Sequence, residues 1–406
     1  MRVLRVYHSG RDSAHRARER ALAAAGVEVV LAVPAAWPPQ EALHAEPFEV
    51  LELPVTRPGD VNRHGWSGDL AAVLARVAPD VLDVHEEPVS VAARQWLAVA
   101  GDRPVVMYSA QNLDKRWPPP FSAYEKHALA RVAAFYPCSR QAASVLRGKG
   151  FAGRVEVLPL GVDEAVFTRG AQVLPTDEVS LLLAGRLVPE KGVRDAVQVL
   201  AAVHSTRAVR LTVVGQGPEQ VAASALAVSL GVADLVDWVP WVDAPRLAAL
   251  YRRAHVVLLP SRATSTWVEQ YGRVITEGWS CGAVPVGYAS GSIPEVVGES
   301  GVTVPEGDVD ALCRAVVGLL DDPARWEALR FPAASPVSSW AVVAQRQQAL
   351  YDAVLTGPGP SAQTGRPAAR AEFGPPAATS VSERPLALPV MRDSRLLHRA
   401  VERLGL

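Results

Sequence analysis

Two glutamates, Glu269 and Glu277, stand on either side of a glycine in the stretch EQYGRVITE. The pattern predicts a polar loop that carries Glu269 and a short helix that starts near Tyr271 or Gly272 and contains Glu277. Free N–H groups at a helix start favour an anion, and Gly272 would let the backbone approach it closely. Carboxylates accept hydrogen bonds from hydroxyl groups, so the pair would suit a ligand that carries both phosphate and hydroxyls. The alternative is an acidic loop residue and an exposed helix position without a ligand.

Two cations, Arg186 and Lys191, occur in AGRLVPEKG, directly after the apolar run EVSLLL. They would lie at the carboxyl end of a parallel strand, where sheets of this type bind ligands. An arginine fork and a lysine point charge could grip a diphosphate. A solvated loop with incidental charge is an equal alternative.

A second loop, VVGQGPEQ, places Gly215 and Gly217 between a strand and a helix. The two glycines would allow the backbone to approach a phosphate or a base. Only part of the dinucleotide-binding fingerprint is present, so a plain tight turn is the favoured interpretation of this segment alone.

The first half of the chain offers polar residues after its strands. Gly10 and His15 follow the first strand, and His85 follows DVLDV, so a base or a hydroxyl contact could lie there; a surface histidine is the commoner outcome. Gln111, in the loop SAQNLDKRWPPPF, could shape an acceptor pocket or merely belong to a connection. No metal site is predicted, because HEE lacks a third ligand at a suitable spacing.

Strands that alternate with helices must position these residues. β-Branched runs recur in the first part of the chain, and the same rhythm restarts after residue 175, from EVSLLLAG to GVTVPEGD. Alternation of this kind predicts βαβ units with parallel sheets, in two doubly wound halves. A helix is expected from Asp12 to Ala25.

Composition excludes several classes of protein. With 41 basic and 42 acidic residues the formal net charge is -1, which gives no field for nucleic acid. Three distant cysteines fit neither a disulfide framework nor a zinc site. The start MRVLRVYHSGRDS lacks the apolar region of a signal peptide, and no apolar run is long enough to span a bilayer. A cytoplasmic protein is therefore expected.

The last part of the chain changes in character. Residues 357–389 are rich in Pro, Gly, Ala and Ser, which predicts a disordered linker. Residues 390–406 predict a basic amphipathic helix that could contact anionic lipid at the inner membrane face or a partner. Packing of this helix on its own domain, or fraying, is an equal alternative.

Taken together, the motifs GRLVPEKG, VVGQGPE, LPS, EQYGRVITEGWSCGAVPVG, GSIPEVVG and PEGD resemble the retaining glycosyltransferases of family 4, in order and spacing. The resemblance covers about residues 1–355 and implies the GT-B fold, with two Rossmann-like domains facing across a cleft. Five ranges are then expected: 1–165 as the acceptor-side domain, 166–334 as the nucleotide-sugar domain, 335–356 as a helix packing back, and the linker and end helix above.

The resemblance also implies roles for individual residues. Arg186 and Lys191 match the positions that neutralise the donor diphosphate without a metal, and Glu269 matches the one that contacts the sugar hydroxyls. Glu277 would hold the ribose hydroxyls. Backbone at Tyr271, Gly272 and Arg273, with the two loop glycines at 215 and 217, would face the donor.

The implied function is retaining transfer of a sugar from a nucleotide-sugar donor, UDP- or GDP-linked, to a glycan, lipid-linked or small-molecule acceptor, with no other cofactor. An epimerase of the same fold and a catalytically silent nucleotide-sugar-binding protein are the alternatives. Two segments depart from the family. Ala110 and Gln111 stand where many relatives have a histidine near the reacting sugar. Gly278 and Trp279 stand where relatives usually have a small residue and an apolar one after the second glutamate, and a close packing contact would explain the glycine inside a helix.

Overall fold

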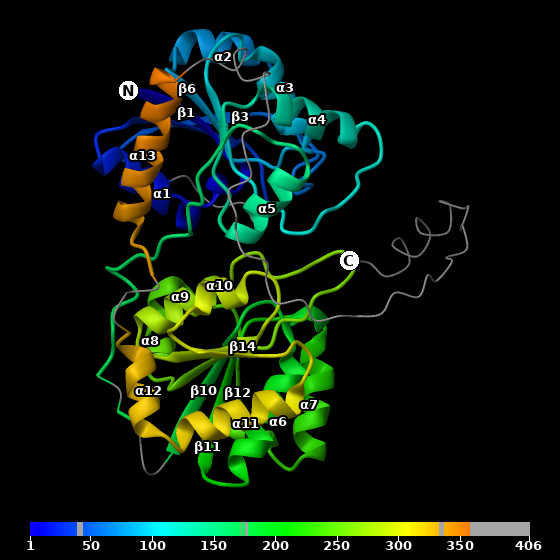
Figure 1. Ribbon diagram of the computed structural model, residues 1–406, viewed down its shortest axis with the longest axis vertical. Helices are drawn as coiled ribbons and strands as arrows, with labels where there is room; N and C mark the ends of the chain where they lie inside the picture. The colour runs from blue at the N-terminus through cyan, green and yellow to red at the C-terminus, as the bar shows by residue number, and fades with distance from the viewer. Residues whose placement is uncertain (39–43, 172, 175–177, 333–336, 358–406) are drawn as a thin grey trace, which may run out of the picture. The chain divides into compact units, whose positions relative to one another are not determined.

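The chain forms two parallel β-sheets, each covered by helices, in a computed structural model that describes residues 1–38, 44–171, 173–174, 178–332 and 337–357 (Figure 1). The predicted doubly wound α/β class is confirmed. The predicted linker at 357–389, apart from its first residue, and the predicted end helix at 390–406 lie outside the described residues. The predicted boundaries between domains stay predictions.

The first sheet has seven strands in the order β3-β2-β1-β6-β7-β8-β9, all parallel. Its strands are β1 (Arg2–Val6), β2 (Glu28–Pro34), β3 (Glu49–Leu53), β6 (Val81–Val84), β7 (Val105–Met107), β8 (Ala134–Phe135) and β9 (Arg154–Val155). Its helices are η1 (His8–Arg11), η2 (Ser13–His15), α1 (Ala17–Ala24), α2 (Leu70–Val77), α3 (Val91–Val99), α4 (Phe121–Arg131) and α5 (Arg140–Gly148). A short antiparallel pair, β4 (Val55–Thr56) with β5 (Gly65–Trp66), stands apart from it.

The second sheet has six strands in the order β12-β11-β10-β13-β14-β15, again all parallel. Its strands are β10 (Glu178–Ala184), β11 (Ala208–Val214), β12 (Val236–Val239), β13 (Val256–Leu259), β14 (Val284–Tyr288) and β15 (Val302–Val304). Its helices are η3 (Pro189–Lys191), α6 (Val193–His204), α7 (Glu219–Ser229), η4 (Ala233–Leu235), α8 (Ala244–Tyr251), α9 (Arg273–Ser280), α10 (Ile293–Val297), α11 (Val309–Leu320) and α12 (Pro323–Arg330).

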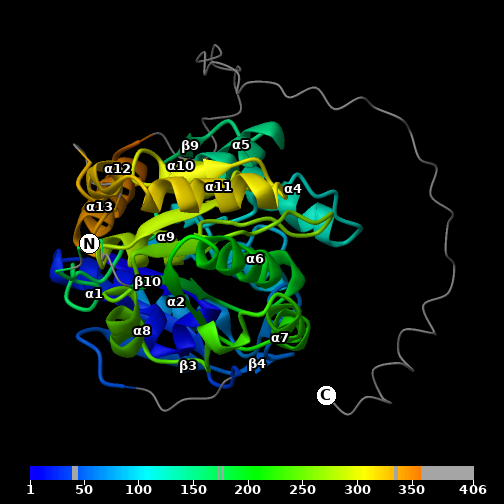
Figure 2. The same cartoon turned by 90° about the horizontal axis from the view of Figure 1, so that it is seen from below.

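The strands are apolar because each sheet is buried on both faces. In the second sheet Leu181, Leu211 and Val256 are fully or almost fully buried in one cluster with residues of α6 and α11. Helix α6 packs against both α7 and α11 on one face of this sheet (Figure 2). The strand ends are therefore held firmly, and the loops that leave them can be positioned accurately.

The last described helix, α13 (Trp340–Thr356), returns to the first sheet and packs beside α1 (Figure 1). A buried carboxylate, Asp83 on β6, accepts hydrogen bonds from Arg5 on β1 and from Gln347 and Tyr351 on α13. Tyr136 also donates to Asp83. Charge-assisted bonds of this kind are strong inside a protein, so the network ties the late helix to the centre of the first sheet.

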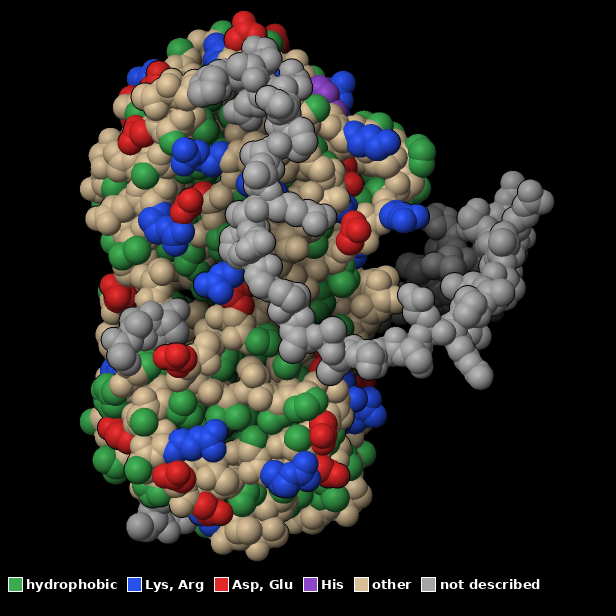
Figure 3. Space-filling model, viewed as in Figure 1, with side chains coloured by type: hydrophobic (Ala, Val, Ile, Leu, Met, Phe, Trp, Pro, Cys, Tyr) green, Lys and Arg blue, Asp and Glu red, His purple; other side chains and the backbone are tan. Residues whose placement is uncertain are grey.

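The surface is mixed in charge on the face shown in Figure 3, where Lys and Arg side chains alternate with Asp and Glu. This agrees with the formal net charge of -1. Among the described helices, none has the length and apolar character needed to cross a bilayer.

Candidate active site

Each sheet has one point where the strand order reverses, and the predicted donor residues gather at that point of the second sheet. Strands β10 and β13 are neighbours there. The loop after β10 carries Arg186 and Lys191, and the loop after β13 carries Glu269. Ligands of doubly wound sheets bind in the crevice at this switch point, because the loops on its two sides leave in opposite directions.

Lys191 and Glu269 form an ion pair across this crevice. The lysine Nζ lies 2.5 Å from Glu269 Oε2, and the side chains are 19% and 8% exposed. Ser261, at the end of β13, donates a hydrogen bond of 3.0 Å to the same carboxylate oxygen. The ammonium group also lies 4.9 Å from the centre of the Trp267 ring. The structure thus brings together two residues that the sequence assigns to one ligand.

Arg186 lies on the same loop as Lys191 but is exposed. No described residue accepts a hydrogen bond from it or pairs with it, whereas the Lys191 charge is already engaged by Glu269. The two predicted cations therefore differ in state: the arginine fork is free for an anionic ligand.

Helix α9 begins at Gly272, which has a φ of 82° and a ψ of 61° as its N-cap. A Cβ at this position would lie 2.9 Å from Ile275 Cδ1 and 3.0 Å from Leu259 Cδ2, so glycine is required both by the backbone and by the space. The helix start predicted at Tyr271 or Gly272 is confirmed.

Glu277 points inward from α9, which excludes the exposed helix position considered from sequence. Its side chain is 8% exposed and accepts a hydrogen bond of 2.8 Å from Arg273, one helical turn earlier. Burial raises the pKa of Glu277, and the Arg273 charge opposes that rise. A buried carboxylate with one cationic neighbour retains lone pairs for ligand hydroxyls.

Tyr271 is buried, and its hydroxyl donates to the Leu160 carbonyl at 3.2 Å. Its side chain therefore ties the loop to the segment that leaves the first sheet. Any contact with a ligand must come from its backbone, as the sequence predicts.

Glycine is required at positions 215 and 217 because a side chain would clash with a neighbouring loop. A Cβ at Gly215 would lie 1.9 Å from the Gly185 carbonyl oxygen, and one at Gly217 would lie 2.3 Å from that of Leu187. The Leu187 N–H also donates to the Gln216 carbonyl at 2.9 Å. The two glycines thus hold the loop after β11 against the loop that carries Arg186 and Lys191.

A cavity of about 550 Å³ is lined by residues that follow both sheets. Arg273 and Glu277 come from α9, and His15 and His85 follow strands of the first sheet. A volume of this size suits a small ligand with several polar contacts. Both predicted histidines and the helix glutamate therefore face one space.

His85 is a neutral side chain in this cavity. Its Nδ1 lies 3.3 Å from an Arg5 nitrogen and 3.1 Å from the Tyr136 hydroxyl oxygen, so this ring nitrogen is engaged by the protein. Burial, together with the Arg5 charge, holds the pKa of His85 well below its usual value. His85 can thus form a hydrogen bond with a ligand hydroxyl through Nε2, and its cationic form is disfavoured.

The other three residues predicted for the acceptor side lie in different surroundings. His15 is exposed on η2, with Nδ1 3.1 Å from the Ser9 carbonyl oxygen. Gly10 is buried, and a Cβ there would lie 3.0 Å from the Tyr7 ring. Gln111 lines a separate cavity of about 190 Å³, and its amide donates to the Leu113 carbonyl at 3.0 Å.

Several contacts at the site were not predicted from the sequence. Asn112, in the loop that was considered for an acceptor pocket, donates a hydrogen bond of 2.7 Å to the Glu269 carbonyl oxygen. Ser261 and Trp267 hold the Lys191–Glu269 pair. His64 approaches His8 and Glu86, and the nitrogen and oxygen donor atoms of these three residues lie within 4.8 Å of one another. Contacts between segments so distant in the chain leave no local signal in a sequence.

Comparison with known families matches both halves of the chain. Residues 19–166 match the family model described as Glycosyltransferase Family 4, and residues 178–322 match Glycosyl transferases group 1.

Among curated proteins, the D-inositol 3-phosphate glycosyltransferase 1 of Catenulispora acidiphila is 30% identical over 74% of this chain and 74% of its own length. The D-inositol 3-phosphate glycosyltransferase of Acidothermus cellulolyticus is 36% identical over 44% of this chain, a match that spans 43% of that protein. A glycogen synthase of Mycobacterium tuberculosis is 32% identical over 52% of this chain and 51% of its own length.

Solved structures share the fold. A sucrose-phosphate synthase from Thermosynechococcus elongatus superposes with a TM-score of 0.67 at 20% identity, covering 87% of this chain and 98% of that one. Anabaena HepE in complex with UDP and glucose gives a TM-score of 0.65 at 17% identity, covering 87% and 100%.

Proposed function

Because the chain belongs to the family 4 glycosyltransferases, also described as glycosyl transferases group 1, we propose that it transfers a sugar from a nucleotide-sugar donor to an acceptor hydroxyl with retention at the anomeric carbon. The observation that carries this proposal is the Lys191–Glu269 pair at the switch point of the second sheet. The donor is UDP- or GDP-linked, and the acceptor is a glycan, a lipid-linked sugar or a small molecule.

The donor diphosphate would lie between the loop after β10 and the start of α9. Arg186 is unpaired among the described residues and exposed, so it can form a bidentate contact with a phosphate. Lys191 adds a second positive charge, and the free N–H groups that follow Gly272 add partial charges. These groups stabilise the charge that develops on the leaving diphosphate.

The two glutamates would bind hydroxyl groups at opposite ends of the donor. Glu277 faces the cavity of about 550 Å³ and is assigned to the ribose hydroxyls. Glu269, held by Lys191 and Ser261, is assigned to the sugar hydroxyls. Neither glutamate is assigned as a nucleophile.

The acceptor would enter from the side of the first sheet. His85 and His15 line the large cavity there, and Nε2 of His85 is assigned to a hydrogen bond with the acceptor hydroxyl. Gln111, which lines the smaller cavity, is assigned to a hydroxyl contact with the acceptor. We propose that the protein acts in the cytoplasm, where it would meet its nucleotide-sugar donor. Residues 390–406 are proposed to make a peripheral contact with the membrane.

A structural neighbour that has been solved with its ligands supports a UDP-linked donor. Anabaena HepE has been solved with UDP-glucose and with UDP and glucose. Calorimetric titration of UDP, UDP-glucose, GDP and GDP-mannose into the protein tests the proposal. Binding of one nucleotide series, weakened by Glu277→Gln, is expected; no binding of any of the four would contradict it.

A further inference from the structure

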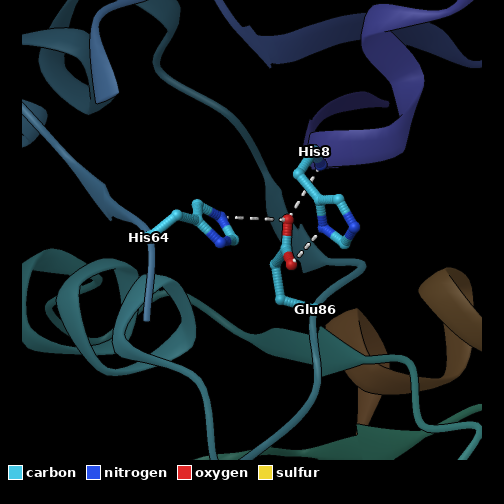
Figure 4. A group of neighbouring side chains, drawn as sticks. All are labelled: His8, His64 and Glu86. Carbon is cyan, nitrogen blue, oxygen red and sulfur yellow. Dashed lines mark hydrogen bonds and ion pairs between the residues drawn. The ribbon is translucent and has the colours of Figure 1, made fainter. Parts of the chain in front are cut away.

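Three side chains from separate segments converge at the switch point of the first sheet (Figure 4). His8 follows β1, Glu86 follows β6, and these two strands are neighbours. His64 directly precedes β5 in the short antiparallel pair. His8 and Glu86 thus lie at the carboxyl ends of two parallel strands, in the position where a doubly wound sheet places its ligand, and the His64 side chain reaches them from outside this sheet.

The imidazole of His64 is held in one tautomer. Its Nδ1 lies 3.1 Å from the carbonyl oxygens of Asp60 and Val61, and a carbonyl can only accept, so Nδ1 carries the hydrogen. The lone pair is therefore on Nε2. A backbone carbonyl bonded to the opposite ring nitrogen is the usual support of a histidine that ligates a metal.

The Nε2 atom of His64 faces a carboxylate without a proton between them. It lies 3.9 Å from Glu86 Oε1, and both side chains are fully buried. No described residue gives this nitrogen a hydrogen bond. Two electron-rich atoms that face each other at a buried position are unfavourable unless a cation or a water molecule lies between them.

Glu86 is oriented by His8. One carboxylate oxygen accepts the His8 backbone N–H at 2.8 Å, and the other lies 2.6 Å from His8 Nδ1. A metal would take the place of the proton between His8 and Glu86. Ligand atoms bound tetrahedrally to Zn²⁺ are roughly 3.3 Å apart. Small side-chain rotations would bring the three donor atoms, now within 4.8 Å of one another, to that spacing.

We propose that His8 Nδ1, His64 Nε2 and a Glu86 oxygen bind a divalent transition metal, with Zn²⁺ as the best fit. Two imidazoles and one carboxylate suit zinc better than magnesium or calcium, which prefer oxygen ligands alone. Three protein ligands leave one coordination position open, as in catalytic zinc sites. His8 and Glu86 line the large cavity, so the open position faces it.

The ring of Trp37 closes this site on another side. Its centre lies 4.8 Å from that of His8 and 4.9 Å from that of His64. The ring limits the entry of water and fixes the planes of both imidazoles. It also places a fluorophore beside the site, which a paramagnetic ion such as Co²⁺ would quench.

The site is distinct from the donor machinery. Arg186 and Lys191 supply the positive charge at the second sheet, whereas His8 and Glu86 belong to the first. A metal here would hold an acceptor hydroxyl and make it more acidic, a role that rests on the proposed function. Binding of the metal itself does not depend on that function.

The test is metal binding by the full chain, freed of any affinity tag and of metal by chelation. Calorimetric titration with ZnCl₂ is expected to show one ion per chain, and Co²⁺ is expected to give visible absorption bands and to quench fluorescence. His64→Ala and Glu86→Gln are expected to abolish stoichiometric binding. His127→Ala, which removes an exposed histidine on α4, is the matched control and should bind as the wild type does.

Folding of each variant is checked by circular dichroism. His64 is fully buried, so His64→Ala could unfold the protein. The His8 side chain is 12% exposed, so His8→Ala is expected to destabilise the protein less than His64→Ala. Co²⁺ quenching that is clearly smaller in Trp37→Phe than in the wild type would place the ion beside this ring, and Trp66, with its ring centre 6.2 Å from that of His64, would account for the remainder. The absence of saturable zinc binding in the wild type, or binding that survives in folded His8→Ala and Glu86→Gln, would overturn the proposal.

Discussion

Lys191 and Glu269 meet at 2.5 Å across the switch point of the second sheet, although 78 residues separate them in the chain. Both side chains are mostly buried, and they contact Ser261 and Trp267. Each group therefore fixes the other, and a ligand that enters the crevice meets a lysine and a glutamate already in place.

Removal of the lysine charge should slow the reaction more than it weakens binding. Lys191→Ala is expected to lower kcat by about 10²–10³, because a positive group aimed at the leaving diphosphate acts mainly in the transition state. Steady-state kinetics with the active donor would measure this. Lys126→Ala on α4, at an exposed lysine, is the control, and an equal loss in both variants would contradict the assignment.

Loss of both members of the pair should be far from additive. Glu269→Ala alone leaves Lys191 without its carboxylate, and Lys191→Ala alone leaves Glu269 buried without its cation. The double variant is expected to differ from the sum of the single variants by roughly 0.5–3 kcal/mol in activation free energy, as expected for groups in contact. A double-mutant cycle on kcat/KM measures this, and simple additivity would show that the pair is not coupled.

Donor affinity should fall in mild acid because of Glu277. Burial raises the pKa of this carboxyl, so it is protonated at a higher pH than an exposed glutamate and then loses one acceptor for hydroxyls. Arg273→Met removes the opposing charge and should move the acid limb of donor binding to still higher pH. Calorimetry across a pH series from about pH 4, near the ordinary pKa of a glutamate, to about pH 8 follows this shift.

The same series needs a control outside the site. Arg314→Met, on the exposed face of α11, should leave the acid limb where the wild type has it. A limb that moves to lower pH in Arg273→Met would contradict the assigned role of Glu277.

Two glycines of the second sheet should respond to alanine with opposite signs. Gly215→Ala is expected to destabilise the protein by more than about 1 kcal/mol, because φ is 134° and the new Cβ would meet the Gly185 carbonyl. Gly318→Ala, in α11 with open space around it, should stabilise by roughly 0.5–1 kcal/mol. Thermal unfolding of both variants compares them; a stable Gly215→Ala variant would refute the packing role.

The buried carboxylate that ties α13 to the first sheet should be costly to replace. Asp83→Asn leaves Arg5 buried with one carboxylate, Glu19, and weakens four hydrogen bonds, so a loss of about 3–5 kcal/mol is expected. Chemical denaturation would measure it. Asp352→Asn, exposed on α13, should change stability little, and similar effects at both positions would contradict this account.

Much of the fold follows from the sequence because buried strands and glycine turns are local signals. The runs EVSLLLAG, RLTVVGQG and AHVVLLPS correspond to β10, β11 and β13. The close contact expected at Gly278 is found, since a Cβ there would lie 2.7 Å from Val257 Cγ2. Strand β9, of two residues, escaped the predictions.

One helix prediction was wrong in its start. Asp12 caps the 3-10 turn η2, where its side chain accepts from the Ala14 N–H at 2.8 Å, and α1 begins only at Ala17. Capping residues mark any helical turn, so the sequence could not separate the two elements.

Site residues could be predicted from the sequence only where they follow a strand whose end could be recognised. Arg186, Lys191 and Glu269 follow recognisable strands, and parallel topology then brings their loops to one edge. His64 precedes a strand of two residues, and its approach to Glu86 depends on a loop path that carries no periodicity. For the same reason the expectation of no metal site, which rested on the HEE segment alone, omitted the histidines at 8 and 64.

The central claim is that this protein consumes a nucleotide sugar at the crevice of the second sheet. Mass spectrometry of a panel of UDP- and GDP-sugars incubated with the protein and mixed glycan acceptors tests it most directly. We predict that one donor is converted to its nucleoside diphosphate with a matching gain of sugar mass on an acceptor, and that Lys191→Ala abolishes most of this conversion. Donors that all remain intact, or that change only at a sugar carbon while the diphosphate bond survives, would contradict the account.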